Sequence, residues 1–551
     1  MNIAHARWLI LLTLLVNAAA MLSPVINSGD SITYAALAQH IALSGDWSNL
    51  VLDGQDWLDK PHLPFWITAL SFKLLGSSAF SYILPGFLFH LLGGYFTYRI
   101  ARLFYGRDTA WLSVLVFVSA YHLMDSSIEV KAETYLTGTI MGACYYWLRY
   151  DAQARLKYLL LGALFSAMAV MTKGVFTLIT ISSGLVAMWL YQGQWRKLWG
   201  GKWLLALVLT LLFTAPEVVA LYLQFDAHPE KVMFGQTHVS GIKFFLWDSQ
   251  FGRFFNTGPI KNTQGHPFYF VLVFLWAFLP WVAVFVAAMS AGMRRLWLRS
   301  GGNDAGFVFL CGAFFVTFGL FSATSFQLDH YTVILFPFAA ILCGKFLADW
   351  LVEAAAARTL RYVQWLIAGV LVGLVVGLSL YTGNVPLTAV VCTLTLALLG
   401  YVYATRRQLR LGAVTYPLLA INLLFVFLSM LAALTLGRYD VAHNVAQVLA
   451  DRPPLPVYVQ AQQMTLQARE LGLYLQQPCI AVDDFASLPS QGGFRVVMQE
   501  KNVAEFTRHH PRYTRVAALQ ATIQKTGTFP KMLKMAQGSW PLDEIAVLQV
   551  P

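Results

Sequence analysis

Two polar runs near the start of the chain organise the rest of the sequence: Asp30-Ser31-Ile32-Thr33-Tyr34 and Trp57-Leu58-Asp59-Lys60-Pro61-His62. They belong to one segment between hydrophobic stretches, where acids, a lysine and tryptophans have little reason to occur unless they act at the membrane surface. Tyr34, Leu37 and Ile41 recur at helical spacing, which predicts an ordered segment. We therefore interpret it as a chemically active loop; the alternative is a solvated connector.

The composition indicates a polytopic membrane protein. Of the 551 residues, 58% are hydrophobic and 12% are charged, whereas soluble proteins carry about a quarter charged residues. The net charge of +11 does not indicate nucleic-acid binding, because the basic residues form short clusters between apolar segments. The five cysteines have no paired spacing, so neither a disulfide framework nor a metal knuckle is predicted.

Apolar windows long enough to cross a bilayer predict about thirteen transmembrane helices. The first covers residues 8–26, which we interpret as an uncleaved span rather than a signal peptide. Clusters of basic residues mark the cytoplasmic loops, among them Arg99, Arg102 and Arg107, and Arg149, Arg155 and Lys157. With the N-terminus cytoplasmic, the unusual polar segments all gather on the outer face of the membrane.

The chain divides into two predicted domains. Residues 1–436 form a transmembrane domain with periplasmic loops at 27–80 and 225–266, and residues 437–551 form a small periplasmic α/β domain. In the second domain, strand-like runs alternate with helix-like ones. The strand-like runs are 455–460, 479–482, 494–498 and 545–550, and the helix-like runs are 465–475 and 502–509. The predicted fold class is an all-α polytopic membrane protein with a C-terminal α/β domain.

Asp30 and Lys60 are the main candidates for chemistry in the first loop. A carboxylate near the membrane surface needs a partner or a task, and Lys60 is the nearest candidate partner in the sequence. Asp30 would act as a general base or orient a cationic group, and Lys60 would hold a lipid phosphate. The alternative for Asp30 is a helix N-cap, a role that is compatible with catalysis.

Further polar residues lie in the other outer segments. Glu133 opens a span, where an acid also stabilises a helix terminus. Arg253 stands between aromatic residues, as a phosphate ligand or a snorkelling anchor would. His330 and Tyr331 lie at the mouth of a span. No Walker loop, HExxH or GxSxG motif occurs, and a divalent metal between Asp30, Glu133 and a histidine is an option that no ligand spacing requires.

These motifs resemble those of the polytopic GT-C type glycosyltransferases that use polyprenyl-phosphate sugars. This family includes the bacterial 4-amino-4-deoxy-L-arabinose lipid A transferases and, more distantly, the protein O-mannosyltransferases. The matching motifs run in family order. They are Asp30 to Ala38, Ser44 to Trp47, Lys60-Pro61 with Phe65-Trp66, Met171 to Gly174, Gln250 to Phe254, His266 to Tyr269, Leu279 to Trp281, Phe321-Ser322 and His330-Tyr331.

The resemblance implies an inverting transfer, in which the acceptor attacks the anomeric carbon and undecaprenyl phosphate leaves. It assigns catalytic roles to Asp30 and Glu133, the latter standing where the family commonly has aspartate. The candidate substrate-binding residues are Tyr34, Lys60, Lys173, Arg253, His266, His330 and Tyr331. Two departures concern the substrates: Ser31 replaces an acid, and the segment Ser325 to Asp329 lacks a lysine found in the family.

The leading hypothesis is an inner-membrane glycosyltransferase that moves 4-amino-4-deoxy-L-arabinose, or another sugar, from a polyprenyl phosphate to lipid A or another outer-leaflet acceptor. Its expected partners are this donor, this acceptor and membrane lipids, and no cofactor is required by the sequence. Two alternatives remain within or near the class: transfer to secreted proteins, and transport of a lipid-linked sugar. A transporter would place charged residues at mid-membrane, whereas here they cluster at one face. A non-catalytic scaffold is a further alternative, under which Asp30→Asn and Lys60→Ala would leave function intact.

Overall fold

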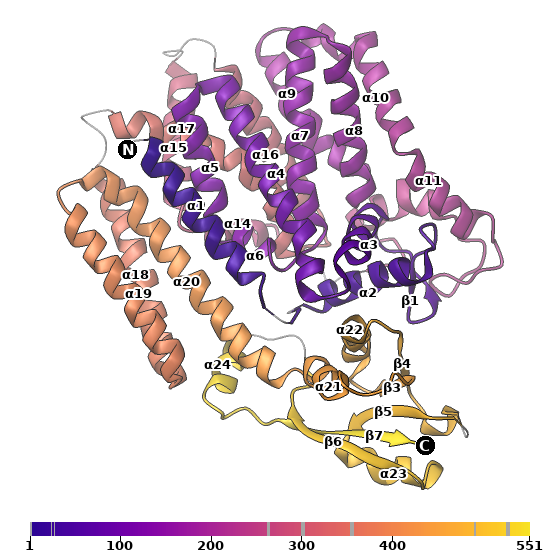
Figure 1. Ribbon diagram of the computed structural model, residues 1–551. Coiled ribbons are helices and arrows are strands. Elements are labelled where there is room, and N and C mark those ends of the chain that lie inside the picture. The colour runs from indigo at the N-terminus through magenta and orange to yellow at the C-terminus, as the bar shows by residue number, and fades with distance from the viewer. Residues whose placement is uncertain are drawn as a thin grey trace.

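The computed structural model shows a bundle of membrane helices with a small sheet domain attached at one end (Figure 1). The N-terminus lies at the opposite end of the bundle from this domain. The structure describes residues 3–23, 25–26, 28–261, 265–298, 304–352, 358–489, 492–524 and 529–551.

Within these ranges, seven helices are long and apolar enough to cross a membrane. They are α4 (Ala79–Tyr105), α8 (Leu156–Lys173), α16 (Ala305–Ala323), a 3-10 turn with α17 (Asp329–Val352), α18 (Arg358–Thr382), α19 (Val385–Thr405) and α20 (Leu409–Tyr439). Two bent pairs raise the number to nine: α10 (Gly201–Phe213) with Ala215–Asp226, and α14 (Tyr269–Ala277) with α15 (Val282–Leu298). The predicted polytopic helical class is confirmed, and the count of thirteen stays a prediction.

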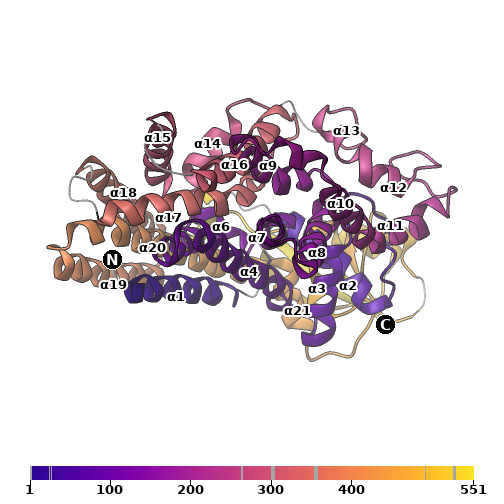
Figure 2. The ribbon, with the colours of Figure 1, turned by 90° about the horizontal axis from the view of Figure 1, so that it is seen from above.

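Other helices complete the bundle. They are α1 (Ile3–Ala20), α5 (Arg107–Val118), α6 (Tyr121–Ser126), α7 (Ala132–Gln153) and α9 (Thr177–Tyr191). Seen from above, α1 and α18 to α20 lie at one end of the bundle, and α10 to α13 lie at the other (Figure 2). The site described below is built from the first outer loop, α7, α8, α13 and the turn before α17.

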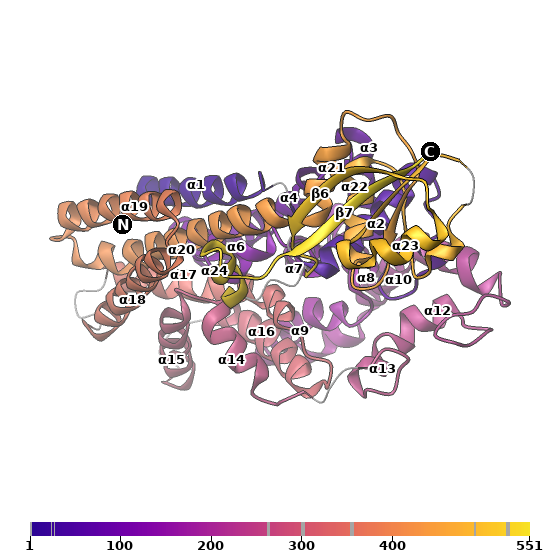
Figure 3. The same ribbon diagram turned by 90° about the horizontal axis from the view of Figure 1, so that it is seen from below.

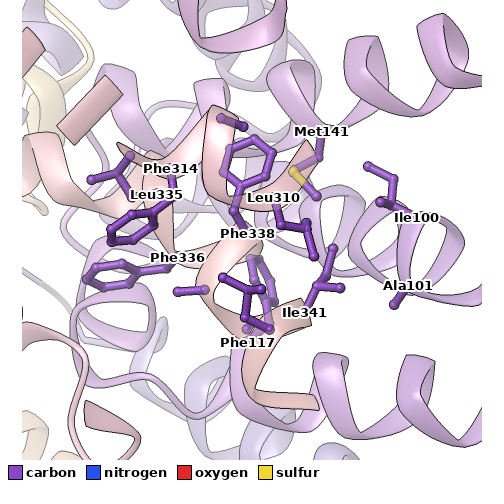
Figure 4. Close-up of a cluster of buried hydrophobic side chains, with 14 of the residues drawn as sticks. Ile100, Ala101, Phe117, Met141, Leu310, Phe314, Leu335, Phe336, Phe338 and Ile341 are labelled. Atoms are coloured by element: carbon purple, nitrogen blue, oxygen red, sulfur yellow. The ribbon is translucent and has the colours of Figure 1, made fainter. Parts of the chain in front are cut away.

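Small residues let the central helices approach closely, as is usual in membranes. A Cβ on Gly138 of α7 would stand 2.8 Å from the carbonyl oxygen of Phe89 in α4, and one on Gly184 of α9 would stand 2.7 Å from that of Phe309 in α16. Buried aromatic side chains of α5, α16 and α17 fill the space between these helices (Figure 4). Packing of this density holds the helix ends, and hence the site, in fixed positions.

The first outer loop is ordered, as its helical spacing predicts. It contains α2 (Gly29–Ser44), a hairpin of β1 (Val51–Leu52) and β2 (Gln55–Asp56), and α3 (Leu63–Leu75). Asp53 and Gly54 both have positive φ angles, of 53° and 77°, as a two-residue hairpin turn with strand twist requires. The second long loop contains the short helices α12 (Gly241–Lys243) and α13 (Phe251–Phe254), and α11 (Ala215–Leu221) precedes it in the bent pair with α10.

The C-terminal domain is a mixed five-stranded sheet with strand order β4-β3-β5-β7-β6. Its strands are β3 (Val457–Gln460), β4 (Cys479–Val482), β5 (Phe494–Gln499), β6 (Thr514–Ala521) and β7 (Asp543–Val550), and its helices are α21 (Val441–Leu449), α22 (Thr465–Leu475), α23 (Val503–His509) and α24 (Phe529–Ala536). The predicted strand-like and helix-like runs coincide with these elements. Strand β6 was not predicted from the sequence, because it is a half-exposed edge strand whose conformation depends on its pairing with β7.

The C-terminal domain holds α2 from below, as Figure 3 shows for α22 and α2. The Gln39 side-chain amide donates a hydrogen bond to the carbonyl of Gly472, 2.8 Å away. Arg469 donates to the Thr33 hydroxyl (3.1 Å) and forms an ion pair with Asp53 (2.5 Å). These contacts fix the helix that carries Asp30.

Gln39→Ala should lower the free energy of unfolding by about 0.5–1.5 kcal/mol, because it removes the buried hydrogen bond between α2 and α22, while the Gly472 carbonyl keeps the backbone N–H donors of Gln476 and Gln477. Thermal unfolding in detergent would measure this, together with limited proteolysis of the C-terminal domain. Gln55→Ala is the matched control, because Gln55 is exposed in the same loop. Equal melting temperatures for the two variants would contradict the role given to this contact.

Candidate active site

A polar cavity of about 240 Å³ lies between the first loop, α7, α8, α13 and the turn before α17. Eight of the nine site residues predicted from the sequence line it: Asp30, Tyr34, Lys60, Glu133, Lys173, Arg253, His330 and Tyr331. These residues are spread over about 300 positions of the chain, so only the packing of the helices brings them together.

Helix ends supply several of the charged groups. Asp30 lies in the first turn of α2 and Glu133 in the first turn of α7, where helix dipoles stabilise carboxylates. Lys173 lies in the last turn of α8, where the dipole stabilises a cation. The three helix termini therefore bring two carboxylates and one ammonium group to the same cavity.

Asp30 differs from the other acids of the site. It is exposed, and among the described residues its carboxylate has no hydrogen-bond or ion-pair partner. The N-cap position of α2 is Ser28, without a side-chain bond, so the capping role considered for Asp30 is not observed. An exposed carboxylate facing a polar cavity is available to a substrate.

Lys60 pairs with Asp59. The pairing of Lys60 with Asp30, which the sequence predicted, is not observed. The Lys60 Nζ lies 2.7 Å from Asp59 Oδ2, and Arg253 forms an ion pair with the other carboxylate oxygen. Burial lowers the pKa of Lys60 to about 8, an effect that the charge of Asp30 partly opposes. Asp59 was missed although it precedes Lys60, because sequence cannot tell which neighbouring side chain turns inward.

Glu133, the second acid of the site, belongs to a network of charged and aromatic side chains. Glu133 forms an ion pair with Lys173, and the His330 Nε2 lies 3.8 Å from the other Glu133 oxygen. The Lys173 ammonium also stands 3.5 Å from the centroid of the Tyr331 ring, a cation–π geometry. Glu133, predicted to be catalytic, is thus placed to fix Lys173, whereas the Asp30 carboxylate stays free.

The two remaining predicted residues have different positions. Tyr34 packs edge-on against Phe65, with the ring centroids 5.0 Å apart, and burial raises its pKa far above the usual value, so it faces the cavity as a neutral hydroxyl. His266 does not line the cavity. Its backbone N–H donates to Gln327 (2.9 Å) and its ring lies near Phe268.

An apolar groove of about 270 Å³ joins the polar cavity and shares Lys60, Lys173, Arg253 and Tyr331 with it. Its other walls are mainly aliphatic and aromatic side chains: Val175, Phe176, Ile179, Phe251, Phe254, Phe255, Leu320 and Phe321. A lipid tail in this groove would carry its phosphate next to three cations. Hydropathy could not locate the groove, because its walls come from four separate segments.

A second apolar cavity, of about 700 Å³, is lined by Ser28 and Gly29 at the start of α2 and by side chains of α6, α18 and α20. Asp125 and Glu129 line it, and burial together with the charge of Glu129 raises the pKa of Asp125 to about 8. Gly29, which lines this cavity, is the neighbour of Asp30, and Asp30 itself lines the polar cavity. In the part of the chain that the structure describes, no group of three His, Cys, Asp or Glu residues is placed to hold a metal ion, so the metal option stays a prediction.

A buried pair positions the loop that carries Lys60. Glu217 of α11 accepts hydrogen bonds from the backbone N–H of His62 (2.9 Å) and lies 2.9 Å from its Nδ1. The His62 Nε2 lies 3.1 Å from the carbonyl oxygen of Ser48, and both side chains are fully buried. The sequence analysis missed this pair, although an acid inside an apolar segment is a recognised signal.

Comparison with known proteins agrees with this architecture. A family model described as dolichyl-phosphate-mannose-protein mannosyltransferase matches residues 59–219. The undecaprenyl phosphate-alpha-4-amino-4-deoxy-L-arabinose arabinosyl transferase 2 of Proteus mirabilis is 24% identical over 330 residues, which are 58% of this chain and 55% of that protein. A transferase of the same description from Pseudomonas aeruginosa is 25% identical over 58% of this chain and 56% of its own length. The chain thus matches little more than half the length of these relatives.

Solved structures cover the chain more fully. The crystal structure of ArnT from Cupriavidus metallidurans bound to undecaprenyl phosphate has a TM-score of 0.73 and 18% identity, and covers 99% of this chain and 98% of its own. The apo form gives a TM-score of 0.72 and 19% identity, with the same coverage. The chain therefore shares the fold of the two ArnT structures, which is the GT-C fold class predicted from the sequence. Within that class, the predicted resemblance to the polyprenyl-phosphate-sugar transferases is confirmed.

Glu217→Ala should lower the free energy of unfolding by about 3 kcal/mol, because two buried donors of His62 lose their acceptor. Thermal unfolding of the purified protein would show this. Glu230→Ala is the matched control, since Glu230 pairs with His228 in an exposed position and its loss should leave the melting temperature unchanged. A Glu217→Ala protein that melts like the control would show that the buried pair is not structural.

Proposed function

We propose that the protein is an inverting glycosyltransferase that moves a sugar from undecaprenyl phosphate to lipid A or a related acceptor. The observation that carries this proposal is the single cavity in which the free carboxylate of Asp30 faces Lys60, Lys173 and Arg253. The adjoining apolar groove supports a lipid-linked donor. Similarity to the arabinosyl transferases favours 4-amino-4-deoxy-L-arabinose as the sugar.

The cations have a direct role in this reaction. The acceptor oxygen attacks the anomeric carbon from the side opposite the phosphate, the bond from that carbon to the phosphate oxygen breaks, and its electron pair leaves with the phosphate. Lys60 and Arg253, bridged by Asp59, would neutralise the departing charge, and such preorganised groups usually make the largest contribution to catalysis.

The role of Asp30 depends on whether the attacking group of the acceptor is a hydroxyl or a phosphate. If the acceptor is a hydroxyl, its proton passes to the Asp30 carboxylate as the new bond forms. If it is an ionised lipid A phosphate, no proton moves and Asp30 orients the donor. The larger apolar cavity beside Gly29 shares no lining residue with the donor groove and would admit the acceptor.

We also propose how the protein is oriented in the membrane. The C-terminal domain and the cavity would face the periplasm, and the N-terminus would face the cytoplasm, in the bacterial inner membrane. Basic residues near the far ends of α4 and α7, such as Arg102 and Arg149, support this orientation.

Asp30→Asn should reduce transfer about 100-fold or more, since the free carboxylate is lost while the helix terminus keeps a polar residue. The assay offers undecaprenyl-phosphate aminoarabinose and lipid A to the purified protein and follows the mass of lipid A. Asp108→Asn, an exposed acid at the other end of the bundle, is the control. Full transfer by Asp30→Asn would refute the role of Asp30, and no transfer by the folded wild type would refute this sugar or acceptor.

Binding of undecaprenyl phosphate should weaken as the pH rises from about 7 to about 9.5. Lys60, with a pKa of about 8, is charged below this pH and neutral above it, whereas the phosphate, with a second pKa of about 6, gains little further charge over this range. Isothermal titration calorimetry in detergent would measure the affinity. Lys60→Arg should remove this pH dependence, because arginine stays charged; an unchanged slope would assign the effect to another group.

A further inference from the structure

A separate cavity of about 880 Å³ lies between α1, α4, α5 and α7. One face of α4 forms its floor, from His90 through Gly94 and Tyr98 to Arg102. The start of α4 packs against α3, beside the candidate active site, so Arg102 near its end lies toward the opposite membrane surface. From His90 to Arg102 the helix rises about 18 Å, which is close to the half-thickness of a bilayer core, about 15 Å.

The cavity has a charged end and an apolar end. Arg99, Arg102 and Arg149 line the end toward the far membrane surface. Toward His90 the walls are apolar, with Leu14, Leu91, Val114 and Val118. This order of groups, charge at the surface and hydrocarbon toward the bilayer centre, is that of a phospholipid.

No acidic side chain of the described residues lines this cavity. The Arg99 guanidinium donates to the hydroxyls of Tyr95 and Tyr145, and Arg149 donates to that of Tyr158 (2.9 Å). The buried Nε of Arg149 has no hydrogen-bond partner within the described ranges. The arginines are thus oriented by neutral groups, and their positive charges are uncompensated.

Two lysines at this membrane surface are paired with carboxylates. Lys197 lies 2.9 Å from Asp151, and Lys345 lies 2.6 Å from Asp349. Arg361 and Arg406 contact aromatic neighbours and form no ion pair with a described acid. What distinguishes Arg99, Arg102 and Arg149 is that they gather on one cavity that no described acid lines. Guanidinium groups that are not paired with carboxylates fit a phosphate, which they bind through two parallel hydrogen bonds.

We propose that this cavity binds one anionic phospholipid of the leaflet opposite the candidate active site. Its phosphate lies among Arg99, Arg102 and Arg149, and an acyl chain follows α4 toward His90. Free phosphate offers the same anion, but it would leave the apolar part of the cavity unused. This site is independent of the proposed transfer reaction and of its donor and acceptor.

Native mass spectrometry of the full-length protein tests the proposal. Delipidated wild type, titrated with phosphatidylglycerol in detergent, should bind one molecule, and phosphatidylcholine should bind at least about tenfold more weakly. The double variant with Arg99→Gln and Arg149→Gln should lose phosphatidylglycerol binding by about tenfold or more. Arg107→Gln, an exposed arginine outside the cavity, should bind like the wild type.

A second variant tests the proposal independently, in case the double variant misfolds. Gly94→Leu keeps every arginine, and its Cβ would stand 3.5 Å from the Phe117 ring, an ordinary contact. The added side chain should occupy the apolar part and weaken phosphatidylglycerol binding about tenfold. Unchanged binding in both variants, equal binding of phosphatidylcholine, or displacement by inorganic phosphate at the same concentration as the lipid would each overturn the proposal.

Discussion

The buried ion pair between Glu133 and Lys173 is the interaction on which the site depends. It joins the first turn of α7 to the last turn of α8, and neither charge is tolerable at this depth without the other. The pair sets Lys173 beneath the Tyr331 ring and brings the turn before α17 to the cavity. Two helices and a third element therefore take a common position because two charges require it.

A second constraint governs the first loop. Lys60 and Arg253 share Asp59, which links the first and second outer loops through a single carboxylate. Behind them, Glu217 and His62 hold the same loop from the bilayer side. With its neighbouring acids engaged in pairs, Asp30 is left as a free carboxylate, and this asymmetry separates a reacting group from the groups that position it.

The cations at the two ends of the bundle have different kinds of partner. At the candidate active site, carboxylates orient Lys60, Lys173 and Arg253, which limits their mobility without removing the net positive charge. In the cavity at the other end, tyrosine hydroxyls orient Arg99 and Arg149. Both arrangements leave positive charge available to a phosphate. At the candidate active site one carboxylate, Asp59, is shared by two cations, and in the other cavity the tyrosine partners are neutral.

The sequence by itself determined the membrane class, the ordered first loop, four of the five strands of the C-terminal sheet and eight of the residues that line the cavity. These follow from hydropathy, local periodicity and short motifs, which depend on neighbours along the chain. The tertiary structure decided the pairing of Lys60 with Asp59, the engagement of Glu133, the position of His266, the edge strand β6 and both apolar cavities. Those features depend on which distant segments pack together, and side-chain direction and helix contacts in three dimensions are not encoded by local spacing.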